Sequence, residues 1–186
     1  SGRSVSLSGD GQTVAIGAHK NDGVNGTDSG HVRVYNLVGT TWQKLGDDID
    51  GETAGDQSGY SVSLSYNGTI VAIGAPYNDG AGTDSGHVRV YEYKSGSWQK
   101  LGDDIDGEDT GDYSSDSVSL NGDGTIVAIG APLSNVVGSV VGIVRVYKYS
   151  GNTWTKLSID IDGEATNDQS GYSVSLSSDG QTVAIG

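Results

Sequence analysis

The sequence predicts an all-β protein, a β-propeller built of four-stranded antiparallel blades of about 56 residues each. Three observations lead to this prediction. The motif SVSL, followed by a turn and the segment VAIG, occurs four times. Trp42, Trp98 and Trp154 are each 56 residues apart, which sets the period. No long apolar stripe with helical periodicity is visible. Four short strands in a period of this length are typical of a propeller blade.

Each repeat opens with a predicted β-hairpin, which is clearest in residues 61–76. Val62 and Leu64 alternate with serines, the pattern of a strand with one apolar side. Asn67-Gly68 follows, a dipeptide that favours a tight hairpin turn. A second, more apolar strand begins at Ile70, and its large residues alternate with Ala and Gly. The small residues would let the next blade approach closely.

Two further strands complete each predicted blade. Residues 30–35 (GHVRVY) alternate cleanly, and residues 41–45 (TWQKL) follow after a turn. The acidic crossover 47–59 then leads into the next hairpin, which suits a return from the outer to the inner strand of a propeller. An open stack of β-sheets, a solenoid, is the alternative arrangement. The same pair of strands recurs at residues 86–91 and 97–101, and at 142–147 and 153–157.

The repeat boundaries define the predicted organisation of the chain. Repeat 1 spans residues 1–60, repeat 2 spans 61–116 and repeat 3 spans 117–172, while 173–186 is the first hairpin of repeat 4. Three and a half blades do not close a ring, because propellers have about 4–8 blades. We therefore expect a segment of a longer protein, whose partners are other copies of itself or the remainder of its own chain. Unpaired edges favour such association.

The net charge of −14 and the lack of cysteine exclude several classes of function. An acidic protein is repelled by nucleic acid and by anionic membrane surfaces. No apolar stretch approaches the ~20 residues of a membrane span, so membrane insertion is not expected. Disulfides and thiolate chemistry are absent because there is no Cys.

The repeats resemble the FG-GAP family, which builds the propeller of integrin alpha subunits. The resemblance lies in Gly59-Tyr60-Ser61-Val62, in Gly74-Ala75-Pro76 and in residues 86–91 (GHVRVY), and it recurs in the later repeats. It implies a propeller fold with adhesive, recognition or structural roles outside the cell. The Phe that the family places before the Gly is Ser58 or Ser170 here.

Calcium is the cation that the resemblance raises. The family often carries an Asp-rich calcium loop between the first two strands, but this turn is shorter here and has a single acidic residue at most. Calcium needs 6–8 oxygen ligands, so that site is not carried over and no cofactor is expected there. The acidic crossovers are weaker calcium candidates, and solvated acidic loops are the alternative. Their candidate ligands are Asp47, Asp48, Asp50, Asp103, Asp104, Asp106, Asp160 and Asp162.

Other repeated polar residues suggest structure rather than catalysis. His31 and His87 lie near serines and aspartates, but the arrangement is duplicated and Ile143 replaces the histidine in repeat 3. A catalytic triad is not expected to recur at repeat spacing, so we predict that the chain is not an enzyme. Equivalent Arg and Lys residues in the three repeats are expected to pair with crossover aspartates. The tryptophans are expected to anchor the outer strands, with a carbohydrate platform as the alternative.

The predicted function is a non-catalytic, extracellular or cell-surface module for protein–protein association or for fibre and surface assembly. A propeller that binds a glycan or protein ligand through its loops is the alternative, and a hydrolase is a remote one. Residues 133–141 break the uniformity of the repeats, as a ligand site would. Asn25 and Asn67 begin N-glycosylation sequons in predicted turns.

Overall fold

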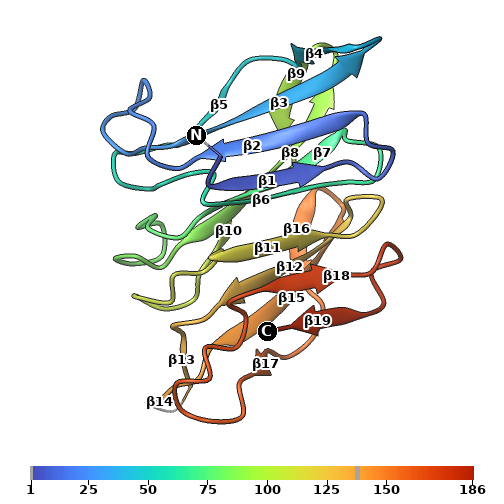
Figure 1. Ribbon diagram of the computed structural model, residues 1–186. Helices are drawn as coiled ribbons and strands as arrows, with labels where there is room; N and C mark the ends of the chain where they lie inside the picture. Colours follow the sequence, from blue (N-terminus) through green and yellow to red (C-terminus); the bar gives the residue numbers. More distant parts are fainter. Residues whose placement is uncertain (1, 137–138) are drawn as a thin grey trace.

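The computed structural model describes residues 2–136 and 139–186, and all their regular secondary structure is β. Three five-stranded antiparallel sheets and a final hairpin follow one another along the chain (Figure 1). Figure 1 shows them stacked from the N-terminal sheet (blue) to the C-terminal hairpin (red), without closing into a ring. The prediction of an all-β fold with antiparallel, blade-like sheets is confirmed.

Repeat 1 shows how each sheet is built. The strand order is β1 (Ser4–Leu7), β2 (Thr13–Ala18), β3 (His31–Val38) and β4 (Thr41–Lys44). A two-residue strand, β5 (Ile49–Asp50), also pairs with β3. The second sheet consists of β6 (Ser61–Leu64), β7 (Ile70–Ala75), β8 (His87–Lys94), β9 (Ser97–Lys100) and β10 (Ile105–Asp106).

The third sheet and the C-terminal hairpin repeat this arrangement. The sheet comprises β11 (Ser117–Leu120), β12 (Ile126–Ala131), β15 (Ile143–Ser150), β16 (Thr153–Lys156) and β17 (Ile161–Asp162). The hairpin comprises β18 (Val174–Leu176) and β19 (Val183–Ile185). β13 (Asn135–Val136) and β14 (Ser139–Val140) form a small hairpin in the divergent loop 133–141, whose residues 137 and 138 lie outside the described part.

Two strands share the outer position of each sheet. A single fourth strand was predicted there from the sequence. β4 pairs with Tyr35–Val38 of β3, whereas β5 pairs with His31 and Val32. The acidic crossover therefore begins as part of the sheet. Ile49 and Ile105 are buried there, because the alternation of a strand directs them inward.

The turn between the first two strands also differs from the prediction. Gly68 has a positive φ of 70°, but Asn67 does not, so the turn is not the two-residue type that Asn-Gly favours. The side chain of Asn67 instead accepts hydrogen bonds from the hydroxyl of Ser65 and the backbone N–H of Thr69. These local side-chain bonds favour a longer loop.

Apolar side chains between adjacent sheets form the core. One cluster joins Ala15, Val32 and Val34 of repeat 1 to Val62 and Leu64 of repeat 2. A second cluster joins repeats 2 and 3 in the same way. β12 is buried along its whole length, because a sheet lies on each of its sides.

Close packing between neighbouring sheets depends on the small side of the second strand. A Cβ atom on Gly17 would lie 2.0 Å from the carbonyl oxygen of Gly59, which leads into β6 of the next sheet. Serine side chains also bond the inner strands together, since the N–H of Leu64 donates to Ser6 Oγ at 2.9 Å. The same bond joins Leu120 to Ser63 and Leu176 to Ser119. The expected close approach of the blades is thus observed.

Candidate functional site: the face of the connecting loops

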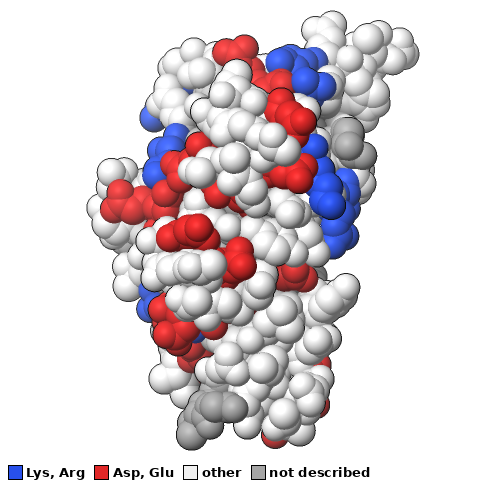
Figure 2. Space-filling view, turned by 90° about the vertical axis from the view of Figure 1, so that its left-hand side faces the viewer, with Lys and Arg blue, Asp and Glu red and all other residues white. Residues whose placement is uncertain are grey.

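Long connections gather at one end of the sheets, and short hairpin turns gather at the other (Figure 1). Figure 2 shows the face of the connections, on which Asp and Glu side chains are numerous in the upper and middle parts and fewer at the lower end. In the described residues the structure has no helix of the length and apolarity that a membrane crossing requires.

One aspartate of each crossover, at the position of Asp48, is held in ion pairs. Lys44 Nζ lies 2.7 Å from Asp48 Oδ1, and Arg33 Nη2 lies 2.9 Å from Asp48 Oδ2. The hydrogen bond from Arg33 is the main cause that lowers the pKa of Asp48 to about 2. Lys100 pairs with Asp104, and both Arg145 and Lys156 pair with Asp160. The expected pairing with crossover aspartates is observed for the three lysines and for Arg33 and Arg145, whereas Arg89 pairs with Glu52.

The remaining calcium candidates are spread along the crossovers. Asp47 and Asp103 are exposed, while Asp50, Asp106 and Asp162 lie in the two-residue strands. Among the described residues, one group of three metal-ligating side chains lies close together, and Asp104 is its only calcium candidate. The other calcium candidates belong to no such group in the described part of the chain. The calcium hypothesis for the crossovers remains a prediction.

Two other crossover carboxylates, Asp56 and Asp112, stabilise turns. Asp56 is buried and accepts hydrogen bonds from the N–H of Thr53 and the side-chain amide of Asn78. Its burial raises its pKa, despite the bond from Asn78. Asp112 accepts a hydrogen bond from the N–H of Asp109 in the same way.

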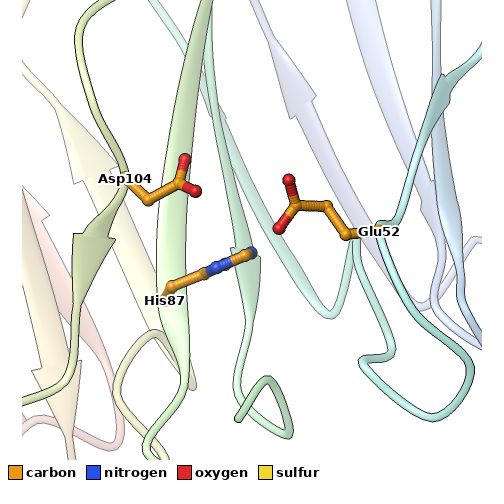
Figure 3. Close-up of side chains that lie close together, drawn as sticks. All are labelled: Glu52, His87 and Asp104. Carbon is orange, nitrogen blue, oxygen red and sulfur yellow. The ribbon is translucent and has the colours of Figure 1, made fainter. Parts of the chain in front are cut away.

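Glu52, His87 and Asp104 form the one cluster of metal-ligating groups in the described part of the chain (Figure 3). One ligand atom from each lies within 4.8 Å of the others. Arg89 Nη1 lies 3.3 Å from the carboxylate of Glu52, and Arg89 Nε donates to His87 Nε2 at 3.3 Å. Lys100 pairs with Asp104 at 2.7 Å. Since both carboxylates already have a cationic partner, the cluster is better described as an ion-pair network than as a metal site.

His87 is neutral in this network. Its side chain is 2% exposed, and this burial is the main cause that lowers its pKa to about 4. The positive charge of the nearby Arg89 lowers the pKa further. Ser85 does not form a triad with it, because the Ser85 hydroxyl donates to the carbonyl of Asn78 and accepts from the N–H of Ala81. The contacts of His87 are thus those of a structural residue.

A row of tyrosines lies on the same end of the repeats, and the sequence analysis did not identify it. The rings of Tyr60 and Tyr77 are 6.3 Å apart, and those of Tyr77 and Tyr113 are 5.3 Å apart. Together with Tyr172 and Asp116 they line a hollow of about 330 Å³, here called the tyrosine groove. Its other lining residues are Pro132, Leu133 and Gln169. These tyrosines could have been found in the sequence as positions where otherwise similar repeats carry different residues.

The two sequon asparagines are exposed, as their predicted turn positions require. The side-chain amide of Asn25 donates to the carbonyl of Gly51 at 2.7 Å. The Asn67 side chain accepts hydrogen bonds within its own turn. Glycosylation at these positions remains a prediction.

Comparison with known proteins concerns the family and the fold. Residues 1–35 and 47–91 match the family model described as FG-GAP repeat. No curated protein sequence matches the chain. Among solved structures, hydrazine synthase of Kuenenia stuttgartiensis is similar over 99% of this chain, with a TM-score of 0.60 and 13% sequence identity. This chain spans 41% of the length of that one, and the low identity shows a likeness of fold alone.

Proposed function

The chain carries FG-GAP repeats, and on this premise we propose that it is a non-catalytic association module. Its sheets stack on further repeats, either of another copy or of a longer chain, in an extracellular or cell-surface assembly. The exposed sequons and the acidic surface support that location. The structural contacts of His87 and Ser85 support a role without catalysis.

The apolar N-terminal face is the observation on which the proposal rests. Val5 and Leu7 of β1 are 66% and 58% exposed. Their equivalents in β6, Val62 and Leu64, are only 9% and 7% exposed, because repeat 1 covers them. Covering one such side chain contributes about 1.5–3 kcal/mol. The N-terminal face therefore has the composition of the interfaces inside the molecule.

Polar groups make the two ends complementary. Inside the molecule, the N–H of Leu64 donates to Ser6 in the preceding repeat. Leu7 is the residue of repeat 1 that is equivalent to Leu64, so its N–H is placed to donate to a serine of a preceding repeat. Ser175 is equivalent to Ser6, so its hydroxyl is placed to accept from the N–H of a leucine in a following repeat. Ser175 is exposed in β18. Stacking of further repeats would use the bonds already seen between repeats.

Sedimentation equilibrium of the 186-residue chain tests the proposal. We expect concentration-dependent association at micromolar protein, and we expect Val5→Ser with Leu7→Ser to weaken it about tenfold or more, since two apolar side chains leave the interface. Val24→Ser is the control, because Val24 is an exposed apolar residue outside β1. A monomer over this range would contradict association between copies, and an association that the double variant leaves unchanged would contradict the assigned face.

A further inference from the structure

The repeats differ from one another at residues that line the tyrosine groove. Tyr60 directly precedes an SVSL strand, and the residues that precede the other SVSL strands are Arg3, Asp116 and Tyr172. Tyr113 corresponds to a glutamine in the neighbouring repeats, at Gln57 and Gln169. A packing role shared by all repeats would use the same residue each time, as the SVSL strands do. The groove is therefore an individual feature of this surface.

The rings of the groove meet at steep angles. The planes of Tyr60 and Tyr77 are inclined by 67°, and those of Tyr77 and Tyr113 by 81°. Such rings do not form the continuous flat platform on which a sugar ring stacks. Aromatic rings set at steep angles around a space, with a nearby carboxylate, resemble the cages that hold alkylated ammonium groups.

The electrostatics of the groove favour a cation. Asp116 is its one charged lining residue and takes part in none of the ion pairs found among the described residues. Burial raises the pKa of Asp116, although Arg3 and Tyr60 oppose this effect. The hydroxyl of Tyr113 donates to a further carboxylate, Asp84, at 3.3 Å. A cation bound here would compensate the carboxylate of Asp116.

The chain itself shows that a cation suits these rings. The guanidinium carbon of Arg3 lies 4.3 Å from the centroid of the Tyr60 ring. Arg3 is not among the residues that line the tyrosine groove, and it lines a separate hollow with His19 and Lys20. One face of the tyrosine row thus already holds a positive charge, while the groove beside it contains no Lys or Arg.

We propose that the tyrosine groove binds an organic cation with an alkylated ammonium group. The tyrosine rings would contact the alkyl groups and attract the charge, and Asp116 would act as the counter-ion. The volume of about 330 Å³ is at the lower end of ligand sites and accommodates such a head group. This binding is independent of the stacking of repeats proposed above.

Isothermal titration calorimetry with choline and with a short trimethyllysine peptide tests the proposal and distinguishes a small-molecule ligand from a modified protein. The control ligand is 3,3-dimethyl-1-butanol, which has the shape of choline without its charge. Binding of either cation about tenfold tighter than the neutral ligand is expected from the cation–π energy. Equal affinity for choline and its neutral analogue, or no binding of either cation, would overturn the proposal.

Three variants locate the site. Tyr113→Gln introduces the residue that the neighbouring repeats carry, and Asp116→Asn removes the counter-ion; each should weaken cation binding about fivefold or more. Tyr66→Ser, at an exposed tyrosine in the β6–β7 turn, should leave binding unchanged. Circular dichroism confirms that each variant is folded. Binding that persists in both groove variants would overturn the assignment, as would preferential binding of a neutral disaccharide that Asp116→Asn does not alter.

Discussion

His87 and Ile143 occupy equivalent positions in repeats 2 and 3. The arginine two residues later has different contact partners in the two repeats. Beside His87, Arg89 donates to the imidazole and to the hydroxyl of Tyr91. Beside Ile143, Arg145 contacts Asp112 and Asp160 at 3.3 and 3.1 Å, and also Glu108. A buried guanidinium needs several partners, and both arginines also contact a crossover glutamate, Glu52 for Arg89 and Glu108 for Arg145.

The buried His87 makes stability depend on pH. Its pKa is about 4 in the folded chain, whereas an unperturbed histidine has a pKa of about 6.5. Between these values the unfolded chain binds a proton that the folded chain does not bind, so the free energy of unfolding falls as pH decreases from about 6.5 to about 4. We expect His87→Ile, the residue of repeat 3, to reduce that fall by up to about 3 kcal/mol.

Urea denaturation of both proteins at several pH values measures this difference. His19→Gln is the matched control, because His19 is less buried and should change the slope less. Identical pH profiles for the wild type and His87→Ile would show that His87 is not held neutral by the fold.

The outer strands are joined from repeat to repeat by tryptophan. Trp98 Nε1 in β9 donates to the carbonyl of Leu45 at 2.8 Å, and Trp154 in β16 donates to Leu101 at 2.7 Å. Both rings pack against the core clusters and against a tyrosine of the same sheet. These contacts agree with the predicted anchoring role for Trp98 and Trp154, whereas Trp42 is exposed.

Trp98→Phe should therefore lower the free energy of unfolding by about 1–2 kcal/mol, because it removes the indole hydrogen bond and part of the apolar contact. Trp42→Phe is the matched control. Trp42 is 44% exposed, and its indole has no hydrogen bond within the described ranges. Equal effects of the two substitutions in chemical denaturation would contradict the anchoring role of Trp98.

At the scale of the whole molecule, stability arises from contacts between neighbouring repeats. β12 is buried throughout, and β7 is buried except at Ile70, since sheets lie on both of their sides. β2 has a sheet on one side and is less completely buried, and β19 is the least covered of these strands. In such arrays, the stability of each unit depends mainly on its own contacts and on those with its neighbours.

Hydrogen exchange should reveal this gradient. We expect the amides of β7 and β12 to exchange most slowly, those of β2 faster, and those of β18 and β19 fastest, because the last hairpin opens with few lost contacts. Mass spectrometry of exchanged peptides provides the measurement, with the equivalent second strands of the repeats serving as internal controls. Uniform protection of all four strands would mean that the chain unfolds as one unit.

The period, the four main strands, the small side of the second strand and the pairing of the lysines, Arg33 and Arg145 with crossover aspartates were predictable from the sequence alone. Each depends on alternation or on residues close together within one repeat. The turn at Asn67 was mispredicted, because side-chain hydrogen bonds outweighed the preference of Asn-Gly for a tight turn.

Contacts between repeats were decided by the tertiary structure. Glu52 reaches Arg89 in the next repeat, and Tyr60, Tyr77 and Tyr113 meet only because successive sheets stack in register. Sequence periodicity places a residue within its own strand, but it does not state the offset between one sheet and the next. That offset comes from the close approach at glycines such as Gly17, and it brings the tyrosines and Asp116 around one groove.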